Sequence, residues 1–278
     1  MAFARWSRWR RQDNMQEFRL ILDGAYDGAT NMARDEAILN AVSTGRQPPT
    51  LRLYAWHPPA ISLGQSQRIA AVDARRCASD GIDIVRRPTG GLAILHAEEL
   101  TYSVALPIQH PLAEGDVMTS YCRIARAILR ALAILGVPDP RADRVAPQDK
   151  AKGPVCFEAP SDYEVVGAGK KLVGSAQWRR LDGVLQHGSL PLAGDIARIC
   201  DYLLDAPSPE RVRAHAATLE EVLGCAVSWS QAAAAWQQAF ADVLDIQFAP
   251  ASLSHEELCA AAELRATKYA HDAWTRRR

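Results

Sequence analysis

The sequence predicts an α+β protein in which flanking helices pack on a mixed β-sheet and a helical region closes the C-terminus. Between residues 50 and 106, short apolar runs are separated by Pro, Gly and polar turn residues, as in strands. Between residues 116 and 135, apolar residues recur every three or four positions, as in a helix packed on one face. Beyond residue 195 the helical period dominates, so helices and strands are largely segregated along the chain.

The first 106 residues predict strands interrupted by two helices. A strand is expected at Phe18–Leu22, followed by a helix at Ala29–Val42 with Thr30 or Asn31 as its N-cap. A shorter helix, Val72–Asp80, ends at Gly81. Five further strands are expected at Leu51–Trp56, Ala60–Gly64, Ile82–Arg87, Leu92–His96 and Leu100–Leu106.

The remaining residues predict a long helix, a strand hairpin and C-terminal helices. The long helix covers Asp116–Leu135 and stops at Gly136, and a polar loop is expected over 138–153. A hairpin turn at Gly167-Ala168-Gly169 joins two strands, and a third strand follows. The strands are Ser161–Val166, Lys170–Ala176 and Val184–Leu190, and the helices are Ile196–Leu204, Thr218–Leu223, Ser228–Val243 and Ser254–Tyr269, the last with a Ser254/Glu257 capping box.

The bulk composition excludes several classes of protein. Lys plus Arg and Asp plus Glu both number 32, so no overall charge favours nucleic acid. No apolar stretch is long enough to span a membrane, and the basic N-terminus lacks the apolar core of a signal peptide. The cysteines stand singly, which disfavours a metal site and a disulfide framework and predicts reduced thiols in the cytoplasm. They are Cys77, Cys122, Cys156, Cys200, Cys225 and Cys259.

Four segments could carry chemistry. In the first, Arg86 and Arg87 end a strand, and Gly90-Gly91 would let the backbone approach a ligand closely. An ordinary hairpin turn with exposed arginines explains this segment equally well. In the second segment, Cys156 follows an irregular loop, where it is either a reachable thiol or one more small buried residue.

The third segment places lysines at the start of an apolar strand. Lys170 and Lys171 point to opposite faces, so one ammonium becomes partly buried if both faces are covered. A buried ammonium needs an anion, and a thiolate could serve, although an exposed hairpin lysine is the commoner case. The fourth segment contains His187 within a strand, which, like His96, is more often a satisfied core residue than a base.

In combination these segments resemble the catalytic domain shared by lipoate-protein ligases and octanoyl transferases. The resemblance covers Asn31 to Leu192 and rests on four motifs in the expected order, with Met32-Ala33-x-Asp35-Glu36 and Lys268-Tyr269 as lesser matches. The motifs are Arg86-Arg87-Pro88-Thr89-Gly90-Gly91 with His96, Thr101-Tyr102-Ser103-Val104, Gly169–Gln177, and Gln186-His187-Gly188-Ser189. The resemblance implies a mixed-sheet fold of the biotin/lipoate ligase type. It also implies a division into a flexible basic extension (1–16), an acyltransferase catalytic domain (17–204) and a helical region packed on it (205–278).

The resemblance also implies which residues form the site. The sequence is similar to the cysteine-dependent octanoyl transferase branch, in which the residues matching Cys156 and Lys171 are catalytic. The substrate-binding residues would be Arg86, Thr89, Gly90, Gly91, His96, Gly174, Ser175, Ala176, His187 and Gly188. Leu92 and Ala97 depart from the ligase pattern at positions that contact the nucleotide or its metal, which disfavours use of ATP. No metal and no cofactor are expected.

The implied reaction is a cytoplasmic octanoyl transfer through a thioester on Cys156. The donor would be octanoyl-acyl carrier protein, and the acceptor a lysine of the glycine-cleavage H protein or of a lipoyl domain. Three alternatives remain: an ATP-dependent lipoate ligase, an amidotransferase between lipoyl domains, and a non-catalytic protein that binds an acyl ligand or a lipoyl domain. The Cys156–Lys171 pairing disfavours the non-catalytic alternative.

Overall fold

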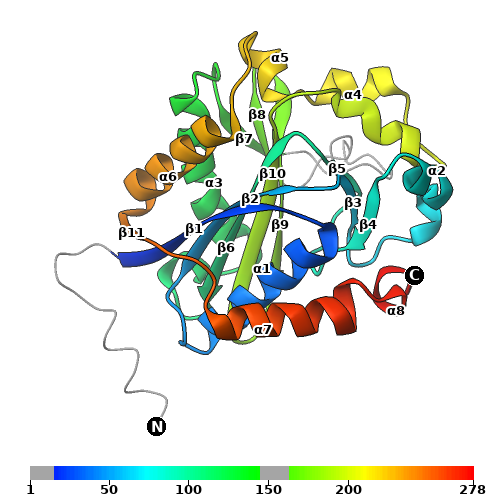
Figure 1. Ribbon diagram of the computed structural model, residues 1–278. Helices are drawn as coiled ribbons and strands as arrows, with labels where there is room; N and C mark the ends of the chain where they lie inside the picture. The colour runs from blue at the N-terminus through cyan, green and yellow to red at the C-terminus, as the bar shows by residue number, and fades with distance from the viewer. Residues whose placement is uncertain (1–15, 145–162) are drawn as a thin grey trace.

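The computed structural model describes residues 16–144 and 163–278, and Figure 1 shows their arrangement. Strands run through both halves of the described chain. They are β1 (Gln16–Tyr26), β2 (Thr50–Trp56), β3 (Ala60–Leu63), β4 (Asp83–Arg86), β5 (Ile94–His96), β6 (Glu99–Pro107), β7 (Arg141–Arg144), β8 (Tyr163–Gly167), β9 (Lys170–Arg179), β10 (Gly183–Pro191) and β11 (Ile246–Pro250).

The helices lie between and after these strands. They are α1 (Gly28–Ser43), α2 (Ala74–Ser79), α3 (Val117–Ile134), α4 (Pro209–His215), α5 (Leu219–Leu223), α6 (Trp229–Leu244), α7 (His255–Leu264) and α8 (Asp272–Thr275). Short 3₁₀ turns cover Ile69–Ala71, Pro111–Ala113 and Ile196–Tyr202, and a π-helical turn covers Arg265–Tyr269.

Across the described ranges the strands form one large and one small sheet. The large sheet has the order β11-β1-β2-β6-β10-β9-β8-β7, with β1 parallel to β11 and β2 and the other pairs antiparallel. The small sheet has the order β4-β3-β5. The predicted α+β class with a mixed sheet is therefore confirmed, and β11 shows that residues 205–278 supply a strand as well as helices.

Side-chain alternation gives the large sheet two chemically different faces. On β1, Phe18 and Leu20 join the main apolar core, beneath α3 and α6. Arg19 and Ile21 point to the opposite face, which α1 covers, and α7 packs against the outer side of α1 (Figure 1). The α1 face carries most of the polar residues of the sheet interior, and these are Arg52, Tyr54, Thr101, Ser103, His187 and Ser189.

The predicted helices and strands are largely confirmed, with differences at their ends. The N-cap of α1 is Asp27, not Thr30 or Asn31, because the Asp27 carboxylate accepts from the Thr30 N–H at 2.9 Å. The Asn31 amide instead donates to the carbonyls of Tyr26 and Ala55. The helix expected at Ile196–Leu204 is a 3₁₀ turn.

Several further elements, among them β7, β11, α4 and α8, were not predicted. The strand β7 lies within the segment 138–153, which was expected to be a loop. It was not predicted because its residues show no alternation of apolar and polar side chains. The strand β11 and the helix α4 are too short for periodicity to reveal them. The predicted Gly167-Ala168-Gly169 hairpin is confirmed, with Ala168 and Gly169 both at positive φ in a two-residue turn.

The small sheet packs beside the α1 face of the large sheet. Its own apolar cluster joins Ile61, Leu63 and Cys77 to residues of the 196–202 turn. Trp56, at the end of β2, stacks flat on His96 of β5, with ring centroids 3.9 Å apart and planes 7° apart. The two sheets therefore meet through these two rings. Among the described residues, no helix is both long enough and apolar enough to cross a membrane.

His110 predicts a measurable acid sensitivity of this fold. Burial lowers the pKa of His110 from 6.5 to about 4, and its Nδ1 accepts from the Leu112 N–H at 3.1 Å. The unfolded chain therefore binds the proton first as the pH falls. Between pH 6.5 and 4 the free energy of unfolding should drop by up to roughly 3 kcal/mol through this group. The His110→Gln variant keeps an acceptor but should lack this part of the drop. Parallel stability-versus-pH curves for the two proteins, from urea unfolding, would contradict the assignment.

Candidate functional site

A cavity of about 150 Å³ lies between the α1 face of the large sheet and the small sheet. Its walls combine aromatic and aliphatic side chains with backbone from the β9 and β10 strands. The lining residues are Met32, Tyr54, Trp56, Ser62, Arg87, Gly91, Leu92, Ile94, His96, Thr101, Gly174, Ser175, Ala176, His187, Gly188 and Ser189. Such an apolar cavity with a few converging polar groups is typical of a small-molecule site.

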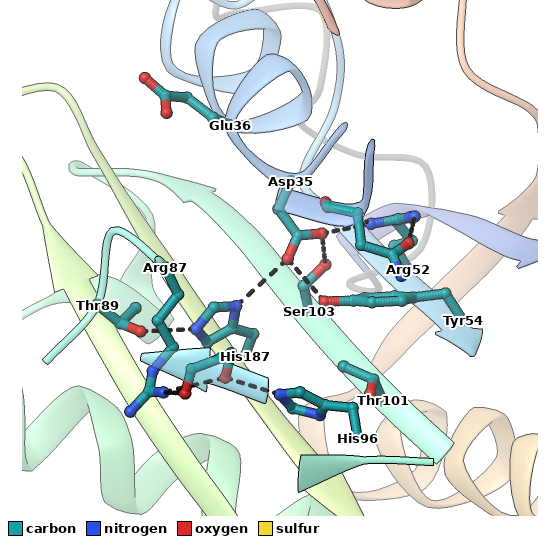
Figure 2. Close-up of polar contacts among 12 residues, drawn as sticks. Asp35, Glu36, Arg52, Tyr54, Arg87, Thr89, His96, Thr101, Ser103 and His187 are labelled. Carbon is teal, nitrogen blue, oxygen red and sulfur yellow. Dashed lines mark hydrogen bonds and ion pairs between the residues drawn. The ribbon is translucent and has the colours of Figure 1, made fainter. Parts of the chain in front are cut away.

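Asp35 is the centre of the polar network beside this cavity (Figure 2). Its carboxylate is fully buried and accepts from Arg52 Nη1 at 2.7 Å, Tyr54 Oη at 2.9 Å and Ser103 Oγ at 2.8 Å. Burial opposes ionisation, but the hydrogen bond from His187 and the charge of Arg52 outweigh it and hold the pKa of Asp35 below 3.8. Asp35 is therefore a permanent anion whose charge Arg52 balances.

The Asp35 anion determines the tautomer of His187. His187 Nδ1 lies 3.3 Å from Asp35 Oδ2 and must be the donor, because a carboxylate only accepts. Burial lowers the pKa of His187 below 6.5, so the ring is neutral and its Nε2 is an acceptor. The Thr89 hydroxyl, 2.7 Å away, donates to that nitrogen. Thr89, His187 and Asp35 thus form one oriented chain.

A second chain runs through His96. His96 Nδ1 lies 2.7 Å from Glu99 Oε1, and its Nε2 lies 2.8 Å from Ser62 Oγ. Thr101 and Ser189 also donate to the Glu99 carboxylate through short hydrogen bonds. Arg87 Nη1 donates to Ser62 Oγ at 3.0 Å, so the Ser62 hydroxyl hydrogen is directed at His96.

The structure places most of the predicted substrate-binding residues in the cavity wall. Those that line it are Gly91, His96, Gly174, Ser175, Ala176, His187 and Gly188. Thr89 lies behind His187, and the Gly90 carbonyl accepts from the Arg87 guanidinium at 2.8 Å. A Cβ on Gly188 would lie 2.5 Å from Ser175 Oγ, so this position requires glycine for packing.

Arg86 lies away from the cavity lining. Its guanidinium donates to the carbonyls of Gly64, Gln67 and Thr275, at 2.8, 2.6 and 2.8 Å. The Trp274 indole donates back to the Arg86 carbonyl at 2.8 Å. Arg86 therefore joins the C-terminal helix α8 to the loop that follows β3, and it positions the edge of the site.

Of the predicted catalytic pair, only Lys171 lies among the described residues. Lys171 is buried, the less common of the two alternatives left open for these lysines, and its Nζ lies 2.8 Å from Glu164 Oε1. Cys156 lies outside the described residues, so its pairing with Lys171 stays a prediction. Glu164, the anion seen next to Lys171, was not anticipated, because nothing in a β-strand sequence marks which neighbour faces a lysine.

Several residues of the site were not proposed from the sequence. Asp35 appeared only within a minor motif, and its partner Arg52 was included in a predicted strand without a role of its own. Glu99 follows His96 at a distance of three residues, which alone does not indicate a pair. Trp56 and Ser62 gave no signal, because only the meeting of the two sheets brings them to His96.

Comparison with known proteins shows the family of this chain. Residues 27–241 match the family model described as the lipoyl protein ligase A/B catalytic domain. The chain belongs to that family. It is 42% identical over 271 residues to octanoyltransferase LipM of Moorella thermoacetica, covering 95% of this chain and 99% of the relative. It is 38% identical over 278 residues to octanoyltransferase LipM of Brevibacillus brevis, covering 95% and 100%.

Solved structures confirm the fold of the family. A bipartite lipoate protein ligase from Thermoplasma acidophilum superimposes with a TM-score of 0.79 at 24% identity, covering 95% of this chain and 97% of that one. A lipoate-protein ligase A bound with ATP gives the same TM-score and identity, covering 94% and 99%. The predicted family and fold type are therefore confirmed, and the individual site residues remain predictions supported by the cavity.

The buried Asp35–Arg52 pair predicts a strong loss of stability on neutralisation. Asp35→Asn leaves the fully buried Arg52 with less compensating charge, so the free energy of unfolding should fall by about 3 kcal/mol. The matched control Ser103→Ala removes one neutral donor to the same carboxylate and should cost about 1 kcal/mol. Urea unfolding of the two variants measures both values, and equal losses would contradict the central role of the ion pair.

Proposed function

We propose that this chain is an octanoyltransferase of lipoate biosynthesis that carries the octanoyl group as a thioester on Cys156. The donor is octanoyl-acyl carrier protein, and the acceptor is a lysine of the glycine-cleavage H protein or of a lipoyl domain. One observation carries the proposal. A chain that matches proteins named octanoyltransferase over 95% of its length has, at the family motifs, an apolar cavity.

The cavity suits a hydrocarbon tail. Met32, Trp56 and Ile94 supply apolar walls, and Gly91 and Gly174 keep side chains out of the space between them. Seven chain carbons buried at about 0.8 kcal/mol each contribute roughly 5 kcal/mol, which is enough to favour a medium chain over a short one. The polar side chains of the cavity include Ser62, His96 and His187, and the carbonyl end of the acyl group would lie against them.

The proposed reaction has two steps. The Cys156 thiolate attacks the donor thioester, the bond from the acyl carbon to the donor sulfur breaks, and octanoyl-Cys156 forms. The acceptor lysine then attacks this second thioester, forming an amide and returning the thiolate. An amide is more stable than a thioester, so no nucleotide is consumed. The backbone N–H groups of Gly174 and Ser175 are candidates to stabilise the developing oxyanion.

Lys171 has the charge required to support the thiolate. Glu164 holds the ammonium of Lys171 in a buried strand position, where it acts with little screening by solvent. An ammonium near a thiol lowers the pKa of that thiol and increases the fraction of reactive thiolate. Residues Arg86, Thr89 and Gly90 then act indirectly, by fixing the loop and the His187 ring that border the cavity.

We place the reaction in the cytoplasm, where a catalytic thiol stays reduced. Among the described residues, Cys77, Cys122, Cys200, Cys225 and Cys259 are all free thiols. A chain with this many unpaired thiols is typical of a reducing compartment.

Cys156 provides the direct test. Intact mass of the wild-type protein after incubation with octanoyl-acyl carrier protein and no ATP should show one octanoyl adduct, and Cys156→Ser should show none. The control variant Cys225→Ser changes an exposed cysteine and should acylate normally. Transfer by Cys156→Ser would contradict the covalent scheme. Pyrophosphate release with free lipoate would instead indicate a ligase. Acylation only by a modified lipoyl domain would indicate an amidotransferase. Binding without turnover would indicate a non-catalytic protein.

The role of Lys171 predicts a pH-dependent defect. Because Lys171→Met alone strands the Glu164 carboxylate, the informative protein is the double variant Lys171→Met/Glu164→Gln, compared with Glu164→Gln alone. Loss of the ammonium should raise the pKa of the Cys156 thiol, so acylation at neutral pH should slow by roughly tenfold or more and recover at alkaline pH. Stopped-flow or quenched acylation rates measure this effect. A double variant with the pH profile of Glu164→Gln would remove Lys171 from the mechanism.

A further inference from the structure

Two hydroxyl–imidazole–carboxylate chains border the cavity, and they differ in how their carboxylates are compensated. In Figure 2, the Thr89–His187–Asp35 chain ends on a carboxylate that also binds Arg52, Tyr54 and Ser103. Asp35 is fully buried and already balanced by a permanent cation. A proton accepted by His187 would meet no unbalanced charge, and it would have no route out through Asp35.

The Ser62–His96–Glu99 chain ends differently. The Glu99 carboxylate is 4% exposed and receives hydrogen bonds from Thr101 and Ser189, both of which are neutral. Within residues 16–144 and 163–278, the Glu99 carboxylate lies within ion-pair distance of His96 but of no Lys or Arg. Glu99 is therefore the counter-ion within reach of His96 Nδ1, 2.7 Å away, for a proton that His96 receives.

Glu99 also connects the cavity with a separate outer cleft. The cavity wall contains Ser62 and His96, whereas Glu99 lines a second space of about 50 Å³ on the other side. That cleft is bordered by Ala97, Glu98, Gly194 and Asp195 among others. The three groups Ser62, His96 and Glu99 therefore span the wall from the cavity to the cleft in an unbroken line of hydrogen bonds.

We propose that Ser62, His96 and Glu99 form the proton relay that accepts the proton of the attacking lysine amine and delivers it to the outer cleft. This inference rests on the proposed transferase function, and it assigns the acceptor for a proton that the acyl-transfer step must release. Ser62 is the group that would contact the amine. His96 and Glu99 act through it.

The step balances as follows. The neutral amine of the acceptor attacks the acyl carbon, the carbon–nitrogen bond forms, and the carbon–sulfur bond breaks to release the thiolate. The nitrogen gives one proton to Ser62 Oγ while the Ser62 hydroxyl proton moves to His96 Nε2. The resulting imidazolium is held by Glu99 until its proton leaves through the cleft. Arg87 supports this direction of transfer. Its guanidinium donates a hydrogen bond to Ser62 Oγ, so the Ser62 hydroxyl hydrogen is directed at His96.

The relay can be tested after the acyl-enzyme has formed, so that the two steps are separated. His96→Gln retains a donor toward Glu99 and an acceptor toward Ser62 but cannot take a proton. In single-turnover transfer from isolated octanoyl-enzyme to a lipoyl domain, this variant should be slower than wild type by about 100-fold at neutral pH. Glu99→Gln should slow the same step, and both rates should rise toward alkaline pH. The matched control Glu114→Gln changes an exposed carboxylate that borders neither the cavity nor the cleft and should transfer normally.

Hydroxylamine distinguishes proton relay from packing. This weakly basic nucleophile loses its proton readily without a positioned base, so His96→Gln octanoyl-enzyme should react with it at the wild-type rate. Equal losses toward hydroxylamine and the lipoyl domain would overturn the relay in favour of a structural role. Wild-type transfer rates in His96→Gln would also overturn the relay, while leaving the proposed function intact. Absence of any octanoyl adduct on the wild-type protein would instead overturn the proposed function.

Discussion

The buried ion pair between Arg52 and Asp35 is the constraint on which the site depends. Arg52 lies on β2 and Asp35 on α1, so the pair fixes the helix over one face of the large sheet. Neither charge reaches solvent, and Asp23 and Asn31 satisfy the remaining guanidinium hydrogens. Removing Arg52 would leave the Asp35 anion buried without a cation, and removing Asp35 would leave Arg52 with Asp23 as its counter-charge, whereas the complete network is fully satisfied. The neighbouring His187 takes its tautomer, and Thr89 its direction, from this one anion.

The polar network occupies the sheet face that α1 covers, and the apolar core occupies the other. The second face is packed by α3 and α6 over β1, β2, β6 and β10 and contributes most of the hydrophobic burial. This division lets the protein keep a cavity and two histidine chains without weakening its core. The glycines of β9 and β10 complete the arrangement, because Gly188 allows the strands to approach where any side chain would collide.

The C-terminal segment stabilises the site from outside. Arg19 of β1 forms a buried bidentate pair with Glu257 of α7, at 2.8 and 2.5 Å. Figure 2 shows Glu36 pointing away from Asp35, and it binds Lys268 at 2.6 Å and also Tyr269. The π-helical turn brings these last two consecutive residues to one carboxylate. Residues more than 200 positions apart therefore fix the register of α1, and with it the position of Asp35.

The α+β class, the order of most strands and helices, the family, and seven of the residues that line the cavity could be predicted from the amino-acid sequence alone. Strand alternation, the Asp116–Leu135 period and the glycine-containing motifs are local patterns. Such patterns can be recognised in the sequence without knowledge of the tertiary contacts. Only the tertiary structure decided that Asp35 and Arg52 form a pair, that Glu164 faces Lys171, and that Ser62 and Glu99 lie on either side of His96. These groups come from different strands and helices, and a buried charge finds its partner through the packing of sheets and helices, which no spacing along the chain records.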